Sequence, residues 1–361
     1  RRTGSLLGVR NVYKQLVNDD EWFTLEILVR QKQVQVRLSK MLVVDYIEPE
    51  QPFSVNTSFH CLVGHGTFAL QTFGSQGATT FKNLQVRPLP DAISQLSNEK
   101  PQVDEVYREI IRLGAENYPV VDYHAHLKGG LTVDAALANS RRVGIGYGLA
   151  INCGMGFPVH DDASVRAYIE SMKGQPCYVA MQGEGREWPT LVTPESAAKF
   201  DYIFTDAMTF RDDTGKRMKI WIPEEIGVIQ DKQAFMEMLV KRIEGVMHEH
   251  IDIYANATYI PDQIGAEYDA LWTPDRMQRV IDAALKDDVA IEINNRRRIP
   301  SPAFIKKAKA AGCRFSFGTN NAEAELGRLE YPIQMVRECG LAWQDIFVPR
   351  PDGQKAIQTR A

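Results

Sequence analysis

From residue 118 to about residue 347, short apolar runs alternate with longer stretches of helical periodicity. Seven of the apolar runs predict buried strands: 119–122, 146–151, 177–181, 202–205, 251–255, 289–293 and 314–317. The clearest helical stretches between them are 133–143, 232–247, 274–285 and 302–311. This alternation predicts a parallel sheet. Regular spacing without a Gly-x-Gly-x-x-Gly turn favours a closed (β/α)7 barrel over a dinucleotide-binding sheet.

The first 92 residues have a different pattern, with apolar and polar positions alternating at the period of a strand. Strands are predicted at 22–29, 34–38, 41–46, 67–73 and 79–86. Several short strands without helical stretches predict an all-β sandwich, and so few strands give it a thin core.

The domain organisation follows from these two patterns. Residues 1–92 are expected to form part of a β-sandwich, and residues 117–361 the barrel. Between them, residues 93–116 carry apolar positions at helical spacing and predict a linker helix. The protein is therefore predicted to be multi-domain.

The composition of the chain limits the kinds of molecule that the protein is expected to bind. A net charge of −4 supplies no basic field for a phosphate backbone, so nucleic acid is not an expected partner. No apolar run is long enough for a transmembrane segment, which needs roughly 20 residues. Five cysteines without paired spacing argue against a disulfide framework. The chain opens without Met or an apolar signal region, so we expect its natural start to be missing.

Polar side chains follow every predicted barrel strand, at the end where parallel α/β barrels place their active sites. They are His124, His126, Asn152, Glu184, Asp206, Asn256, Glu292, Asn294 and Asn320. A barrel with a purely structural role would not need a polar residue at the end of all seven strands. The sequence therefore predicts a functional site at the mouth of the barrel.

Within this set, His124 and His126 are separated by one residue, so both can face the barrel interior. Two neutral imidazoles at that spacing can chelate a cation such as zinc. Glu184 and Asp206 complete the predicted ligand set, although Glu184 could be an exposed turn carboxylate and Asp206 a helix cap. By contrast, His248 and His250 follow a predicted helix and are expected at the opposite face.

The remaining candidates are assigned to catalysis or substrate binding. Asp206 and Glu292 are the predicted general bases, because Glu292 must face opposite to its apolar neighbours and so point into the barrel. The predicted substrate-binding residues are Asn152, His160, Arg186, Asn256, Asn294 and Asn320. His160 lies on a loop that should overhang the mouth, and a basic run at 296–298 could bind an anion there.

The barrel resembles the PHP (polymerase and histidinol phosphatase) family of metal-dependent phosphoesterases. The resemblance rests on 121–126 (Val-Asp-Tyr-His-Ala-His), on Glu184, and on 291–295 and 316–321. It implies a PHP-type seven-stranded barrel that binds divalent metal, Zn or Mn. The sequence departs from the family pattern at Asn152, Asp206, Asn256 and Asn320. An amide is a poorer ligand than a carboxylate, so we expect one or at most two ions rather than three.

Residues 21–27, 42–46, 66–71 and 81–86 resemble the later strands of the 3-keto-disaccharide hydrolase domain, a concanavalin-like sandwich. That resemblance implies a carbohydrate-contacting or spacer module without its own catalytic cluster. Together the two halves are similar to exported proteins of Bacteroidetes, which implies the periplasm or the cell surface.

Three functions stay open at this stage. The first is a metal-dependent hydrolase acting on a phosphoester or a small sugar-derived substrate. The second is a metal-assisted lyase or glycoside-cleaving enzyme. The third is a carbohydrate-binding protein whose barrel has lost its metals, which the three amides Asn152, Asn256 and Asn320 favour.

Overall fold

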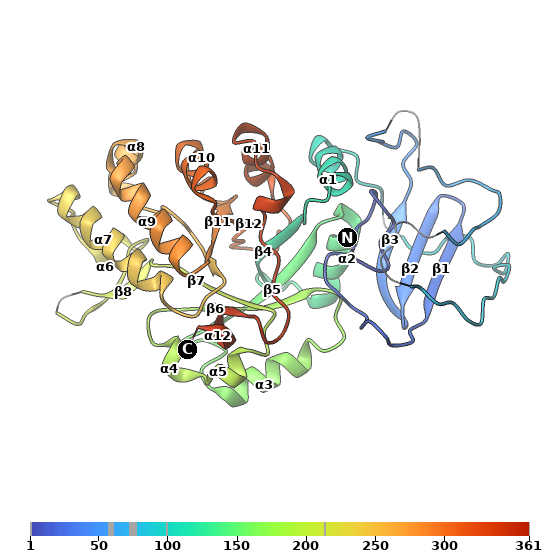
Figure 1. Ribbon diagram of the computed structural model, residues 1–361, viewed down its shortest axis with the longest axis horizontal. Coiled ribbons are helices and arrows are strands. Elements are labelled where there is room, and N and C mark those ends of the chain that lie inside the picture. The colour runs from blue at the N-terminus through green and yellow to red at the C-terminus, as the bar shows by residue number, and fades with distance from the viewer. Residues whose placement is uncertain (1, 57–60, 72–77, 99, 213, 361) are drawn as a thin grey trace.

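The computed structural model describes the chain except residues 1, 57–60, 72–77, 99, 213 and 361. Seven parallel strands form a closed barrel in the order β10-β11-β12-β4-β5-β6-β7 (Figure 1). The strands are β4 (Val121–His126), β5 (Gly146–Cys153), β6 (Tyr178–Gly183), β7 (Tyr202–Thr205), β10 (Ile253–Tyr254), β11 (Ala290–Asn294) and β12 (Phe315–Gly318). Each lies within or beside a predicted apolar run, so the predicted barrel of seven parallel strands is confirmed.

Helices follow the strands around the outside of the barrel. The longer ones are α2 (Val133–Val143), α3 (Asp162–Ser171), α7 (Lys232–Met247), α9 (Pro274–Lys286), α10 (Pro302–Ala311) and α11 (Glu330–Glu338). Most begin at a polar side chain that accepts a hydrogen bond from a free backbone N–H, as Thr132, Asp231, Thr273 and Ser301 do. The shorter elements are α4 (Trp188–Leu191), α5 (Pro194–Ala197), β8 (Thr209–Arg211), β9 (Arg217–Lys219), α6 (Pro223–Ile226), η1 (Asp262–Glu267), α8 (Tyr268–Leu271), η2 (Trp343–Asp345) and α12 (Ala356–Thr359).

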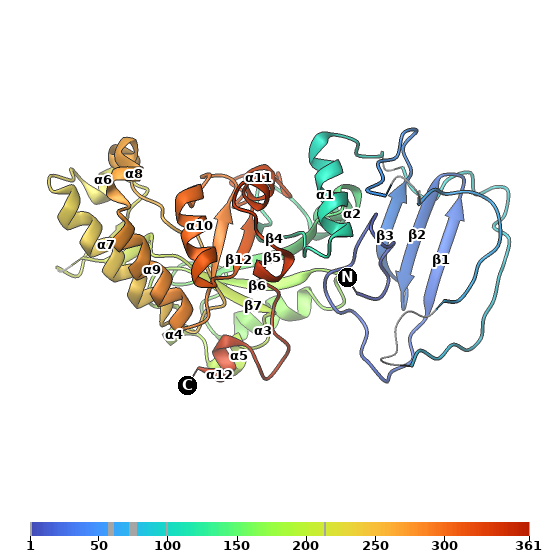
Figure 2. The same ribbon diagram turned by 45° about the horizontal axis from the view of Figure 1, so that its top comes forward.

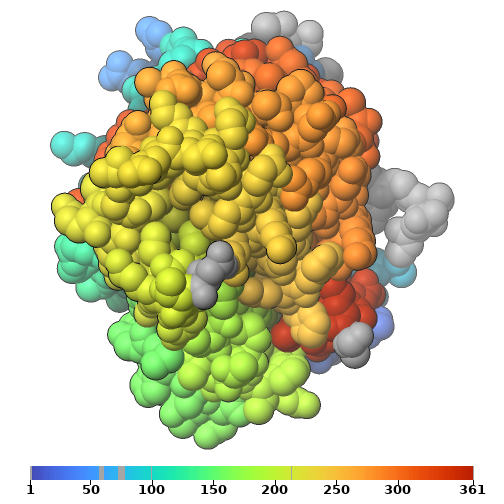
Figure 3. Space-filling view, turned by 90° about the vertical axis from the view of Figure 1, so that its left-hand side faces the viewer, coloured from blue at the N-terminus to red at the C-terminus, as the bar shows by residue number. Residues whose placement is uncertain are grey.

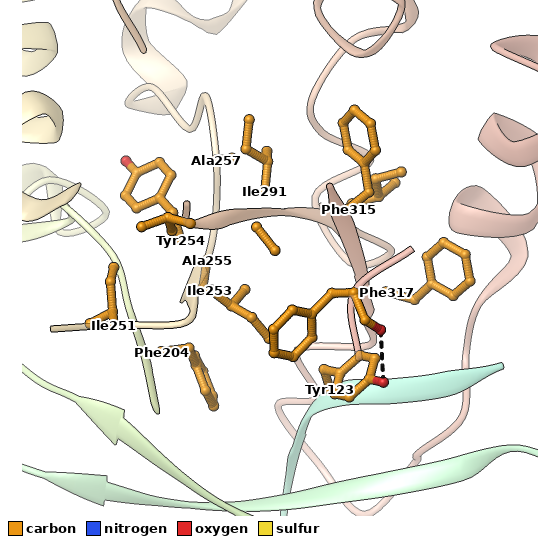
Figure 4. Close-up of a cluster of buried hydrophobic side chains, with 14 of the residues drawn as sticks. Tyr123, Phe204, Ile251, Ile253, Tyr254, Ala255, Ala257, Ile291, Phe315 and Phe317 are labelled. Atoms are coloured by element: carbon orange, nitrogen blue, oxygen red, sulfur yellow. Dashed lines mark hydrogen bonds between the residues drawn. The ribbon is translucent and has the colours of Figure 1, made fainter. Parts of the chain in front are cut away.

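Buried aromatic side chains, among them Tyr123, Phe204 and Phe317, pack beside aliphatic ones around the barrel strands (Figure 4). The Tyr123 and Tyr202 rings meet edge to face with centroids 5.4 Å apart, and the Tyr202 hydroxyl donates to the Tyr123 carbonyl at 2.6 Å. The Tyr123 hydroxyl in turn donates to the Phe347 carbonyl at 3.0 Å. These buried hydroxyls are satisfied, as buried polar groups must be.

The N-terminal residues form a three-stranded antiparallel sheet of β1 (Leu25–Arg30), β2 (Gln33–Leu38) and β3 (Met41–Ile47). These three strands were predicted. The strands predicted at 67–73 and 79–86 are wrong where the structure describes them, since 67–71 and 79–86 are not strands; residues 72 and 73 lie outside the described part.

The reason lies in burial. Phe68, Leu70, Leu84 and Val86 are 67%, 55%, 64% and 74% exposed. An alternating pattern forms a strand when one face has something to pack against. The described residues provide a single three-stranded sheet here, without a second sheet to cover these side chains.

Helix α1 (Glu105–Ala115) connects the sheet to the barrel and is capped by Asp104, whose side chain accepts from the Tyr107 N–H. It is shorter than the predicted 93–116, because the described residues before 104 are not helical. The sheet lies beside α1 and α2, at the end of the molecule away from α7 and α9 (Figures 1 and 2). Among the described residues, none of the helices could cross a membrane.

Arg10 joins the sheet to the barrel. Its guanidinium donates to the last carbonyls of α2, Arg141 O at 2.9 Å and Arg142 O at 2.8 Å, which lack partners within the helix. It also lies 5.1 Å from the ring centroids of Tyr46 in β3 and Tyr107 in α1. One buried side chain therefore contacts three elements.

We predict that Arg10→Ala loosens the sheet more than the barrel. Loss of the helix-capping hydrogen bonds and of both ring contacts should lower the free energy of unfolding by about 2 to 4 kcal/mol. Hydrogen exchange followed by mass spectrometry should show β2 and β3 losing protection before β4 to β6. Arg37→Ala, which removes a half-exposed arginine of the same sheet, is the control. Equal loss of protection in the sheet and in the barrel would contradict the role of Arg10 as the residue that joins the sheet to the barrel.

Candidate functional site

His124 and His126 lie at the end of β4, where the sequence placed them. Their ring centroids are 5.3 Å apart, and the His124 ring lies 4.7 Å from that of Phe204 on β7. Both residues are buried, at 2% and 3% exposure. Alternate residues of a strand share a face, so both imidazoles lie on the interior side. The geometry brings the two candidate ligands together.

Glu292 on β11 holds His124. Its Oε1 accepts a hydrogen bond from His124 Nδ1 at 2.6 Å, and its Oε2 accepts from the Asn256 backbone N–H at 2.6 Å and from Asn294 Nδ2 at 3.0 Å. Burial disfavours the charged carboxylate, yet His124 and the donors from Asn294 and Asn256 bring the pKa of Glu292 below its usual value. Both oxygens are therefore occupied in a charged carboxylate.

This hydrogen bond crosses β12, which separates β11 from β4 in the barrel. Gly318, the last residue of β12, makes the crossing possible. A Cβ at Gly318 would lie 2.1 Å from Glu292 Oε1 and 2.8 Å from His124 Cβ. At such distances a side chain would have to displace Glu292 or His124, so the hydrogen bond between these two residues depends on Gly318.

A set of asparagines connects Glu292 to Asp206 at the end of β7. Asn256 Nδ2 donates to Asp206 Oδ2 at 2.8 Å, and Asn256 Oδ1 accepts from Asn294 at 3.2 Å and from Asn320 at 2.8 Å. Asn256 and Asn320 have φ of 50° and 51°, a conformation that asparagine tolerates better than most residues. The turns after β10 and β12 thereby direct both amides to the same network.

Glu184 and Asp206 form the acidic side of the mouth. Burial and the neighbouring Asp206 carboxylate raise the pKa of Glu184 to about 7, although Asn152 Nδ2 donates to its Oε1 at 2.5 Å. Burial also raises the pKa of Asp206, against the donors Met208 N–H and Asn256 Nδ2. Glu184 is half-buried and Asp206 is buried, and two such carboxylates that influence one another resist joint ionisation unless a cation lies between them.

His126 is held differently from His124. Its Nδ1 lies 3.1 Å from the Ala150 carbonyl, and its backbone exchanges two hydrogen bonds of 2.8 Å with the Asn321 side chain. Burial, with His124 and Lys128 nearby, lowers the pKa of His126 well below its usual value. The ring is therefore neutral, with Nδ1–H donating to Ala150, which leaves Nε2 as the atom with a lone pair.

Two predicted substrate-binding residues have other contacts. His160 is exposed on the loop after β5, with Nδ1 3.2 Å from the Phe157 carbonyl. The Arg186 guanidinium forms an ion pair with Glu249 at 2.6 Å and donates to the Asp206 carbonyl at 2.9 Å. Arg186 thus supports the backbone behind Asp206, and substrate roles for both residues stay predictions.

The histidine pair outside the mouth follows the prediction. His248 ends α7, and its Nδ1 lies 2.5 Å from Asp287, which ends α9. Both residues precede a strand, so they lie at the amino-terminal face of the barrel.

Sequence reasoning missed several residues of the site. Asp122 is fully buried and accepts from the Thr319 N–H and hydroxyl at 2.9 and 2.6 Å, and from the Gly327 N–H at 3.2 Å. It fixes the turn that carries Asn320 and Asn321. A charged residue inside an otherwise apolar strand was the available signal. Lys128, which donates to the Asn321 carbonyl at 3.1 Å, gave no such signal.

A divalent cation fits the donor chemistry of the mouth in part. Two imidazoles with Nδ1 engaged and two carboxylates with raised pKa values are a suitable zinc set. Yet in the described part of the chain no three His, Cys, Asp or Glu side chains are assembled for a metal ion. Glu184 and Asp206 are instead directed to Asn152 and Asn256, and ligation would need them to turn from these amides.

Comparison with known proteins bears mainly on the N-terminal part. Residues 1–87 match the 3-keto-alpha-glucoside-1,2-lyase-like domain family, which confirms the resemblance predicted for these residues. No curated protein matches the chain. Among solved structures, N-acetyl-D-glucosamine-6-phosphate deacetylase from Mycobacterium smegmatis is similar at 12% identity and a TM-score of 0.34, over 67% of this chain and 73% of that one. So low a score carries no argument, and the PHP resemblance stays a prediction.

We predict that Gly318→Ala breaks the contact between β4 and β11. The methyl group must displace Glu292 or His124, which should cost about 1 to 3 kcal/mol in the free energy of unfolding. Urea unfolding measures this cost, and NMR of the histidine rings should show loss of the hydrogen-bonded His124 Nδ1 proton. Gly245→Ala on α7, where a Cβ meets open space, is the control. An unchanged ring signal in Gly318→Ala would count against the crossing.

The raised pKa of Glu184 predicts a pH dependence of stability. The folded protein binds this proton up to about pH 7, while the unfolded chain releases it near its ordinary pKa of about 4.3. The unfolded state therefore binds fewer protons in that window, and stability falls as pH rises through it.

Glu184→Gln should remove this loss. In chelator-treated protein, the stability of the variant relative to wild type should grow by roughly 2 to 3 kcal/mol between pH 5 and pH 8. Urea unfolding at both pH values measures it, with Glu170→Gln on α3 as a surface control. Parallel pH profiles for wild type and Glu184→Gln would show that the carboxyl is not perturbed.

Proposed function

We propose that this protein is a hydrolase of small, sugar-derived substrates, and that its barrel mouth binds one divalent cation. The pairing of Glu184 and Asp206 beside His124 and His126 carries the proposal. Glu184 is half-buried and Asp206 is buried, and two such carboxylates with raised pKa values need positive charge close by if both are to ionise. The neutral His126 and the oriented His124 offer lone pairs at the same place.

His124, His126 and Glu184 would hold the cation. The ion would supply a Lewis acid that activates water and polarises the scissile bond. Asp206 is the group we assign as general base, because its raised pKa and its fixed position between the Met208 N–H and Asn256 Nδ2 suit proton transfer.

Glu292, the other predicted base, has a different role in this proposal. Both of its oxygens accept strong hydrogen bonds and its pKa is lowered, so it is a poor proton acceptor. It acts through His124 by fixing the donor at Nδ1, which directs the Nε2 lone pair to the mouth. Glu292 is thus a positioning residue.

The lining of the mouth supports a hydroxyl-rich substrate. Asn152 and Asn320 are half-buried at its rim, with amide groups that can both donate to and accept from sugar hydroxyls. The match of residues 1–87 to a 3-keto-alpha-glucoside-1,2-lyase-like domain is consistent with a carbohydrate substrate. A phosphoester bond as the bond cleaved and a periplasmic or cell-surface location stay predictions.

A second candidate is a carbohydrate-binding protein without metal. One observation favours it: each carboxylate of the mouth already accepts a hydrogen bond from an asparagine, Glu184 from Asn152, Asp206 from Asn256 and Glu292 from Asn294. Amide donors can offset part of the negative charge that a cation would otherwise offset.

Metal content and activity separate the two candidates. After removal of metal and reloading with zinc or manganese, elemental analysis should find about one ion per chain, and none in His124→Ala, since roughly four ligands are needed. The loaded protein should hydrolyse a member of a panel of phosphorylated and unmodified sugar derivatives, and the chelated protein should not.

The double variant His248→Ala, His250→Ala is the matched control and should retain both metal and activity. Three ions per chain would contradict the single-cation site. Sugar binding by the protein in the absence of both metal and turnover would favour the binding candidate.

A further inference from the structure

Two cationic residues lie at the rim of the mouth, one on each side of the turn that follows β12. Lys128 comes shortly after β4, and its Nζ donates to the Asn321 carbonyl in that turn at 3.1 Å. Arg296 comes shortly after β11, next to Asn295, whose N–H donates to the Gly318 carbonyl of β12 at 2.8 Å. Because β12 lies between β4 and β11 in the barrel, the two residues flank its carboxyl end.

The contacts of the basic run 296–298 separate Arg296 from its two neighbours. The Arg297 guanidinium lies 4.8 Å from the Tyr259 ring centroid, and the Arg298 guanidinium lies 4.9 Å from that of Tyr331. Arg296 is exposed and has neither a hydrogen bond nor an ion pair with the residues that the structure describes. Within this run, Arg296 is therefore the residue whose charge is available to a ligand.

Lys128 is half-buried and lies close enough to Arg296 for the two positive charges to interact. Burial and Arg296 lower the pKa of Lys128, whereas Glu184 and Glu323 raise it. Among the described residues, the ammonium group forms no ion pair with either carboxylate, and its hydrogen bond goes to an uncharged carbonyl. An anion between Lys128 and Arg296 would offset the repulsion between these two like charges.

Two arginines on another side of the barrel provide a contrast. Figure 3 shows the side of the molecule that carries α7 and α9. There Arg276 and Arg279 form ion pairs with Glu237 at 2.9 and 2.7 Å, and Arg279 forms another with Glu244 at 2.8 Å. The charges of these arginines are offset within the protein.

The position of the two rim cations also suits a role in substrate binding. Lys128 is one of the groups that act on the carboxyl of Glu184, so its charge reaches the mouth itself. Asn320, which lies in the turn between Lys128 and Arg296, is half-buried at the same rim. A substrate whose hydroxyl groups meet this amide would bring its neighbouring substituents to the two cations.

We propose that Lys128 and Arg296 bind an anionic group of the substrate, which makes the substrate a sugar acid or a sugar phosphate. This inference rests on the function proposed above, since it takes the barrel mouth as the substrate site. Both classes of sugar offer oxygens that accept charge-assisted hydrogen bonds from an ammonium and a guanidinium group. The two side chains would orient the substrate, and the bond that is cleaved would lie nearer His124 and His126.

NMR titration of the metal-free full chain tests the proposal without requiring turnover. Glucuronate and glucose 6-phosphate are the anionic probes, and glucose is the neutral one. At least one anion should bind about tenfold more tightly than glucose, a difference of about 1.4 kcal/mol. This preference should decline at about 1 M salt, where charges are screened within about 3 Å.

Substitutions that remove one charge at a time locate the anion. Lys128→Gln and Arg296→Gln should each lose most of the preference, because glutamine keeps a hydrogen-bond donor but not the charge, and both should bind glucose as wild type does. Arg298→Gln makes the same change of charge in the same turn and should keep the preference. Arg296→Gln alters an exposed side chain, so the test stays decisive if Lys128→Gln does not fold.

Binding of neither anion, equal binding of the anions and glucose, or an unchanged preference in Arg296→Gln and in folded Lys128→Gln would each overturn the proposal. A failure of the proposed hydrolase gives a different result. If the zinc-loaded protein hydrolyses none of the sugars while the two glutamine variants lose the anion preference, the anion site stands and the hydrolase does not. Hydrolysis of neutral sugars in preference to anionic ones would support the hydrolase and overturn the anion site.

Discussion

The candidate site depends on one hydrogen bond, from His124 Nδ1 on β4 to Glu292 Oε1 on β11. It passes over β12 at Gly318, the one kind of residue whose lack of a side chain leaves room for it. From Glu292 the network continues through Asn256 and Asn294 to Asp206. A single buried carboxylate thereby fixes the orientation of an imidazole on one side of the mouth and of an amide on the other.

Burying such a network lowers the stability of the folded protein unless every polar group in it has a hydrogen-bond partner. Glu292 is 1% exposed and His124 is 2% exposed, so burial removes the hydrogen bonds that each would make to water. If either partner were absent, the other would be buried without a hydrogen bond to replace them. The asparagine side chains provide these partners, because each amide can donate to a carboxylate while accepting from a neighbouring residue. On the Glu184 and Asp206 side, burial and the neighbouring Asp206 carboxylate together raise the pKa of Glu184 to about 7. The Glu292 side of the mouth therefore holds a charged carboxylate whose oxygens all have hydrogen-bond partners, whereas the Glu184 and Asp206 side disfavours negative charge. A cation is therefore expected beside Glu184 and Asp206.

Much of the barrel could be predicted from the sequence, because each buried strand needs its own apolar run and each helix its own cap. Ile291 and Ile293 illustrate this, since both are fully buried and leave Glu292 pointing inward as the alternation requires. The strand predicted at 67–73 is absent from its described residues, 67–71, because alternation specifies a face but not what covers it. The pairing of Arg186 with Glu249 could not be predicted, because the two residues lie 63 positions apart and no local pattern reveals such a contact. The asparagines were found at the strand ends, but their connections to one another depend on barrel closure.

The most direct measurement of the central claim is anomalous diffraction from crystals grown with zinc. We predict a single strong peak at the barrel mouth, with Nε2 of His124 and His126 both at about 2.0 to 2.1 Å from the zinc ion. The Nδ1 of His124 should remain hydrogen-bonded to Glu292 in that structure. A mouth without a peak, or a peak ligated by His248 at the opposite face of the barrel, would contradict it.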